Sequence, residues 1–135
     1  MTPGFSTHVF KVSTSDGRNF TLLEDFTYTS NSGTVYTIPA GSQSDGASTP
    51  RSIWVEIPPF GSYWIAAFFH DWLYRYSSFP EATCNALLLE AMQNLGVNPI
   101  LAKMIYDGVE LGGWSSFKQD RAAQLAAQAA SQVKP

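Results

Sequence analysis

Apolar and polar residues are arranged differently in the two halves of the chain. Residues 1–41 contain short apolar segments that alternate with polar residues and are separated by Gly-, Asn- and Ser-containing turns. The clearest segment, 34–38 (TVYTI), is β-branched and aromatic throughout, which is typical of a β-strand. We therefore expect a small antiparallel sheet of three to four strands between residues 7 and 38.

The second half has helical patterning. Residues 63–76 (YWIAAFFHDWLYRY) form an apolar and aromatic run that is long enough for about four helical turns. Residues 78–81 fit a capping box with Pro80 in the first turn, and Asn98-Pro99 fits a third helix start. The expected helices span 62–77, 80–95, 99–111 and 117–133, the last of them rich in Ala and Gln.

These patterns predict one α+β domain, in which a small antiparallel N-terminal sheet packs on a C-terminal bundle of about four helices. The domain covers residues 1–135, with a β-rich part (1–41), a loop (42–61) and a helical part (62–135). The loop, SQSDGASTPRSIWVEIPPFG, has no regular period, and long irregular segments of this kind are often functional. The alternative is a simple crossover from the sheet to the helices.

The composition argues against several classes of protein. The formal net charge is −3 and there is no run of Lys or Arg, so binding of nucleic acid through its phosphates is not expected. The single cysteine, Cys84, excludes an internal disulfide and a multi-cysteine zinc site. The sequence shows no signal peptide and no segment able to span a bilayer.

Candidate chemistry is concentrated at His70 and Asp71, which lie side by side in the apolar run. A helix that is apolar on nearly every face is expected to be buried. Burying a carboxylate beside an imidazole is costly unless both are paired, hydrogen-bonded or bound to a metal. We therefore expect Asp45 of the loop to lie within hydrogen-bonding or metal-sharing distance of His70, Asp71 or Arg75.

One interpretation of this cluster is catalytic. His70 and Tyr74 share a helix face at i and i+4, and His70 can act as a general base. Asp45 is then a third acid, and Asp45, His70 and Asp71 could form a facial metal triad. The candidate catalytic residues are His70, Asp71, Tyr74 and Asp45, and the candidate binding residues are Arg51, Trp54 and Arg75.

The other interpretation is structural. An Asp beside a His in a helix can hydrogen-bond to a loop and hold it against the helices, with Asp45 or Arg51 as the partner. Trp54 is then a core residue. Asp107 and Glu110 lie three positions apart on the third helix, where they either face the site or, as we expect, belong to a solvated helix face. The residues alone leave both interpretations open.

Four motifs in order resemble a known family. They are IPAG at 38–41, SDGASTPR at 44–51, HDWLYR at 70–75 and EAM at 90–92. Over roughly residues 34–112 the chain is similar to the bacteriophage-associated domain of unknown function 1353. The resemblance implies a phage or prophage gene and supplies no established activity. That family usually has an Asp early in the second helix, where this chain has Asn85.

The helix around His70 is also similar to the His-Asp helix of secreted phospholipases. That resemblance implies His70 as the base, Asp71 as a calcium ligand and Tyr74 as a supporting hydroxyl. Asn85 stands roughly where the second-helix Asp of that family orients the histidine. No glycine-rich calcium loop of the expected form precedes the helix. The flanking cysteines are replaced by Ala66, Ala67 and Leu73.

Two functions follow. The first is a virion-associated or tail component, with other phage structural proteins as partners, no cofactor, and the His-Asp cluster as a folding device. The second is a small envelope-directed hydrolase, phospholipase-like or assisted by calcium or zinc, that contacts the host envelope. Aromatic richness and sparse charge favour the first, and the irregular loop beside a buried His-Asp pair favours the second. The expected location is the virion or the host cytoplasm.

Overall fold

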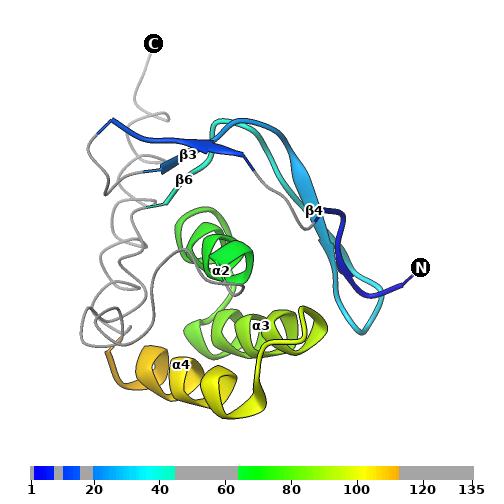
Figure 1. Ribbon diagram of the computed structural model, residues 1–135, viewed down its shortest axis with the longest axis vertical. Helices are drawn as coiled ribbons and strands as arrows, with labels where there is room; N and C mark the ends of the chain where they lie inside the picture. The colour runs from blue at the N-terminus through cyan, green and yellow to red at the C-terminus, as the bar shows by residue number, and fades with distance from the viewer. Residues whose placement is uncertain (1, 8–10, 16–19, 45–63, 113–135) are drawn as a thin grey trace.

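The computed structural model describes residues 2–7, 11–15, 20–44 and 64–112. This part of the chain forms six short strands followed by three helices, labelled as in Figure 1. The strands are β1 (Gly4–Phe5), β2 (Val12–Ser13), β3 (Phe20–Leu22), β4 (Phe26–Thr29), β5 (Val35–Ile38) and β6 (Gln43–Ser44). The helices are α2 (Trp64–Tyr76), α3 (Glu81–Asn94) and α4 (Pro99–Gly112).

The described strands pair in antiparallel fashion and form two small sheets, ordered β1-β4-β5 and β2-β3-β6. The longest pairing joins β4 to β5, with Phe26 opposite Ile38 and Tyr28 opposite Tyr36. Gly33 lies in the turn between them at φ 91°, a conformation in which a residue with a side chain would be strained. The strand predicted from the TVYTI segment is therefore confirmed as β5.

The predicted single sheet of three to four strands is wrong in number and extent. β1 lies before residue 7, β6 lies after residue 38, and β3 and β4 belong to different sheets. β1, β2 and β6 are each two residues long. So short a strand cannot show the alternation of apolar and polar residues by which strands are recognised. β6 also falls inside the segment that was predicted to be a loop.

Figure 1 shows α2 between the strands on one side and α3 and α4 on the other. On the strand side, the ring of Phe69 lies 4.9 Å from that of Tyr28 and 5.6 Å from that of Tyr36. Trp64, at the start of α2, meets Phe20 of the second sheet edge-to-face at 4.8 Å. On the other side α2 packs on α3, and α3 packs on α4. The described part of the apolar run, 64–76, thus forms the middle layer, which explains why nearly all faces of α2 are apolar.

Of two helix starts predicted from the sequence, the structure confirms that of α4 and contradicts the capping predicted for α3. Asn98 accepts a hydrogen bond at 2.9 Å from the backbone N–H of Ile100 and caps α4 as predicted. At α3, however, Pro80 is the N-cap residue, with ψ 155°, and no side chain caps the helix. The capping box predicted at 78–81 is therefore wrong, because the extended backbone of Pro80 delays the helix until Glu81.

The described residues contain three helices, where about four were predicted. The fourth predicted helix, 117–133, lies outside the described residues. The α+β class is confirmed, since the described strands lie before residue 45 and the described helices after residue 63. None of these three helices is long and apolar enough to cross a membrane.

Candidate functional site: a buried histidine network

His70 lies in the middle of α2 and is 1% exposed. Its Nε2 atom lies 2.7 Å from Oδ1 of Asn85, which is on α3 and is also buried. The hydroxyl of Tyr74, one turn after His70, donates to the same oxygen at 2.8 Å. Asn85 therefore accepts two hydrogen bonds from α2, and the two helices are joined by polar contacts inside the core.

The same network extends to α4. Nδ2 of Asn85 donates to Oε1 of Glu110 at 3.2 Å. Glu81, one turn before Asn85 on α3, interacts with the side chains of Asn85 and Tyr74. We call these five side chains the His70–Asn85 network: His70, Tyr74, Glu81, Asn85 and Glu110. It lies where three helices meet, and each helix contributes at least one member.

The network determines which nitrogen of His70 carries the proton. Since the amide nitrogen of Asn85 donates to Glu110, its oxygen faces His70, and only an N–H on Nε2 can bond to that oxygen. Nδ1 then carries the lone pair. Burial lowers the pKa of His70 to about 4, and the hydrogen bond with Asn85 opposes this shift. His70 is therefore neutral at neutral pH, with Nδ1 as its basic nitrogen.

The ionisable groups around Asn85 affect one another. Burial raises the pKa of Glu81, a hydrogen bond with Asn85 opposes the rise, and the charge of Glu110 adds to it. Burial is also the main reason why the pKa of Tyr74 is raised, so its hydroxyl stays protonated and can donate. Glu110 is exposed and also bonds to Tyr106, whose pKa this hydrogen bond raises. The network thus reaches from the core to the surface of α4.

Asp71, the neighbour of His70, has a different partner. It is buried, and Nε of Arg75, one turn later on α2, lies 3.3 Å from its Oδ2. An ion pair within its own helix therefore contributes to the compensation of the buried carboxylate, although this contact does not have the geometry of a hydrogen bond. The structure thus places Tyr74 with His70, and Arg75 with Asp71.

The described residues do not fit the calcium site that the resemblance to phospholipases implies. Calcium binds through several oxygen ligands, whereas Asp71 faces the cationic guanidinium of Arg75. Within the described ranges, no group of three or more His, Cys, Asp or Glu side chains is placed to hold a metal ion. Asp45, Arg51 and Trp54 lie outside the described residues. The contact expected for Asp45, and the metal triad that includes it, therefore stay predictions.

Three members of the network, Glu81, Asn85 and Glu110, were not among the site residues predicted from the sequence. Asn85 stands out there as a departure from a family pattern and, by the resemblance to phospholipases, at roughly the position of the residue that orients the histidine. Glu110 was expected on a solvated helix face, with a position facing the site as the alternative. Glu110 is exposed, yet its carboxylate accepts a hydrogen bond from Asn85. Asp107 does lie on a solvated face, where it pairs with Lys103 at 3.0 Å. The available signal was the i, i+4 spacing of Glu81 and Asn85, which places both on one face of α3.

A second polar cluster attaches the turn between β4 and β5 to α3. Oε1 of Glu90, from the EAM motif, accepts from the hydroxyl of Tyr28 at 2.5 Å and from the backbone N–H of Asn31 at 3.0 Å. Nδ2 of Asn94 donates to the Tyr28 hydroxyl at 3.0 Å and to Oδ1 of Asn31 at 3.1 Å. We call these four residues the turn clamp. They give the EAM motif a structural role.

The IPAG motif forms a turn that is also held by polar contacts. The backbone N–H of Ala40 donates to Oδ1 of Asp25 at 2.6 Å, and the hydroxyl of Ser42 donates to the carbonyl of Pro39 at 2.7 Å. Gly41 has φ 92°, which disfavours any residue with a side chain. This motif therefore shapes the path from β5 to β6.

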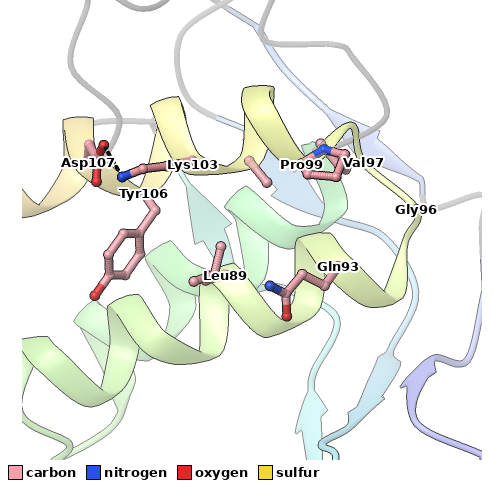
Figure 2. Close-up of a pocket in the computed structure, with 9 residues that line it drawn as sticks. Leu89, Gln93, Gly96, Val97, Pro99, Lys103, Tyr106 and Asp107 are labelled. Carbon is pink, nitrogen blue, oxygen red and sulfur yellow. Dashed lines mark hydrogen bonds and ion pairs between the residues drawn. The ribbon is translucent and has the colours of Figure 1, made fainter.

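A groove of about 630 Å³ lies between α3 and α4. Figure 2 shows Leu89 and Gln93 on α3, facing Lys103 and Tyr106 on α4, with the turn at 96–99 closing one end. This volume is within the range of about 300–1,000 Å³ that is common for ligand pockets. Because Tyr106 both lines the groove and bonds to a member of the network, the two features are neighbours.

The layers and the network define a small α+β domain in which a buried histidine–amide network joins three helices. Over residues 20–109 the chain matches the family described as "Protein of unknown function (DUF1353)", and it belongs to this family. The matched region runs from β3 into α4. The resemblance of the chain to this family is thereby confirmed. Neither the curated proteins nor the solved structures gave a significant match.

Proposed function

We propose that this chain is a bacteriophage or prophage accessory protein, a virion-associated or tail component with a structural or interaction role. In this proposal the His70–Asn85 network is a folding device. The observation that carries it is the 2.7 Å contact between His70 and Asn85 at a position where His70 is 1% exposed. A buried polar network whose members are hydrogen-bonded makes the packing of its helices specific.

The protonation chemistry of the site supports the same proposal. A general base works best when its pKa lies near the working pH. Burial instead lowers the pKa of His70 to about 4, which makes it a weak base. The second candidate, Asp71, is engaged by Arg75 within the same helix. Both features are those of a structural cluster.

The phage and virion part of the proposal is supported by the motif resemblance at 38–51, 70–75 and 90–92, which implies a phage or prophage gene. The partners of such a component are other phage structural proteins. Its location is the virion or the host cytoplasm, and its function requires no cofactor.

His70→Gln tests the structural role. Because Gln lacks the imidazole that packs on Tyr74 at 4.3 Å, we expect a lower midpoint of chemical denaturation. Ala86→Gln, at an exposed position of α3, is the matched control and should leave the midpoint unchanged. Metal analysis of the purified protein should find no stoichiometric metal. An unchanged midpoint for His70→Gln, or a stoichiometric metal that is lost on Asp71→Ala, would contradict the proposal.

One observation favours the alternative, an envelope-directed hydrolase. Asn85 and Tyr74 hold the imidazole in one orientation, with Nδ1 as the acceptor, and a general base needs such an orientation. In this alternative, Nδ1 of His70 takes a proton from a water molecule whose oxygen attacks a lipid ester carbonyl. The acyl C–O bond then breaks, and the protonated imidazole returns the proton to the departing alcohol oxygen. Asp45 and Asp71 serve as the acidic partners, and the described residues provide no route through calcium or zinc.

The two functions differ in a measurable way. The purified chain is incubated with phospholipid vesicles, and released fatty acid is measured with and without added calcium or zinc. The structural proposal predicts no release above that of buffer. Release that is abolished by His70→Gln, while the unfolding midpoint is retained, would establish the hydrolase.

A further inference from the structure

The outer surface of α4 carries an exposed apolar pair. Ile100 is 74% exposed and Met104 is 47% exposed, and they lie one helical turn apart. Beside them lie Lys103 and Asp107, which form an exposed ion pair at 3.0 Å. We call Ile100 and Met104 the apolar pair, and Lys103 and Asp107 the charged pair. Figure 1 shows α4 at the edge of the molecule, with α3 and α2 between it and the strands.

The charged pair lines the edge of the groove on α4, and the apolar pair lies on the far side of the charged pair. Successive residues of an α-helix are rotated by about 100° around its axis. By this rotation, Ala102 and Tyr106, which line the groove, are followed around α4 by the charged pair and then by the apolar pair. One face of the molecule therefore presents the groove, the charged pair and the projecting apolar pair, in that order.

We propose that this face binds a second copy of the chain, with the two α4 helices parallel about a two-fold axis that runs along the charged pair. Such an axis exchanges the two sides of the face. The apolar pair of each copy then enters the groove of the other, where Leu89, Val97 and Ala102 provide apolar walls. Both contacts are identical by symmetry, as an isologous interface requires.

The charges fit the same arrangement. Near the axis, the Lys103 ammonium of each copy lies between its own Asp107 and Asp107 of the second copy. Each lysine then has two acidic neighbours, and no net charge is brought into the interface. The same face supplies the projecting apolar pair, the groove and both signs of charge. The surface is therefore complementary to a second copy of itself. A second copy is therefore the occupant that the face fits, whether the network is structural or catalytic.

The test is the oligomeric state of the full chain, measured by sedimentation velocity over a range of concentrations. We expect a dimer that dissociates on dilution. Ile100→Asp and Met104→Lys should each weaken it by about tenfold or more, since each removes an apolar contact from both halves of the interface. Leu23→Asp, at a 53% exposed position outside this face, is the control and should leave the dimer unchanged.

Charge reversal tests the position of the axis. Lys103→Asp alone places acidic groups opposite one another and should favour the monomer, whereas Lys103→Asp combined with Asp107→Lys should restore the dimer. Both positions are exposed, so the unfolding midpoint of each variant should stay close to that of the parent. A chain that is monomeric at every concentration overturns the proposal. So does a dimer insensitive to Ile100→Asp, or a monomer that uses this face to bind a different protein.

Discussion

The hydroxyl of Tyr28 on β4 donates to the carboxylate of Glu90 on α3 at 2.5 Å, although the two residues lie 62 positions apart in the chain. Burial raises the pKa of Tyr28, and the hydrogen bond to Glu90 raises it further, so the phenol stays protonated and remains a donor. The same carboxylate oxygen accepts the backbone N–H of Asn31. One acidic side chain therefore attaches both a strand and the following turn to α3.

Glu90→Ala should lower the free energy of unfolding by about 2 kcal/mol, because it leaves the buried hydroxyl of Tyr28 without its charged acceptor. Chemical denaturation measures the change. Glu24→Ala is the matched control, since Glu24 is exposed and, within the described part of the chain, pairs with exposed Lys11 at 3.2 Å. Exposed ion pairs contribute little to stability. Equal effects of the two substitutions would contradict a role for Glu90 in the turn clamp.

Asn85→Ala should destabilise the fold, although it removes only a few side-chain atoms. It removes the acceptor of both His70 and Tyr74, and a buried donor without an acceptor costs about 1–3 kcal/mol. The midpoint of chemical denaturation should therefore fall well below that of Ala86→Gly, a control at an exposed position of the same helix. A smaller loss than in the control would show that the network does not stabilise the junction.

Asn85→Asp should change the ionisation of His70. A carboxylate at this position still accepts from His70 and Tyr74, but it adds a negative charge beside the imidazole and cannot donate to Glu110. The pKa of His70 should therefore rise from about 4, which NMR titration of its ring protons would measure. A pKa that stays at the parent value would mean that the His70–Asn85 contact is not formed in solution.

Stability should fall as the pH drops from 6.5 to about 4. In this interval His70 binds a proton in the unfolded chain, where its pKa is 6.5, and does not bind one in the folded chain, where its pKa is about 4. The unfolded state therefore binds more protons, and acid favours it. The full effect amounts to about 3 kcal/mol. Unfolding curves of the parent and of His70→Gln at several pH values should show a shallower dependence in the variant.

Asp71→Ala should lower the free energy of unfolding by about 3–5 kcal/mol, because breaking a buried ion pair leaves the guanidinium of Arg75 without its counter-charge. Asp107→Ala, at an exposed ion pair of the same i, i+4 spacing, is the control and should change stability by less than about 1 kcal/mol. Chemical denaturation of both variants is the measurement. An unchanged midpoint and slope for Asp71→Ala would show that its carboxylate is not buried.

The three described helices could be predicted because their signals are local and long. The run at 63–76 extends over several turns, and the capping residue Asn98 acts on its own helix. The sheet was predicted less well. β1, β2 and β6 are defined by pairing with distant strands, and two residues carry no periodic pattern of their own.

The burial of His70 and Asp71 followed from the apolar run, but their partners did not. The partner of His70 is Asn85, 15 positions away, and no local pattern in the sequence joins the two. Only the resemblance to phospholipases placed Asn85 at roughly the position of a residue that orients the histidine. The partner of Asp71 is closer: Arg75 lies at i+4 on the same helix, and that spacing was visible in the sequence.

The two polar clusters have a joint consequence for α3. Asn85 connects this helix to α2 and α4, and Glu90 and Asn94, further along it, connect it to β4 and its turn. The connections go to different neighbours, so a rotation of α3 about its own axis would break contacts on two sides at once. Apolar contacts alone would tolerate such a rotation, because one apolar side chain of α3 can take the place of another against an apolar surface. Directional bonds at two points along the helix therefore select one docked orientation of α3 among several that are almost equally well packed.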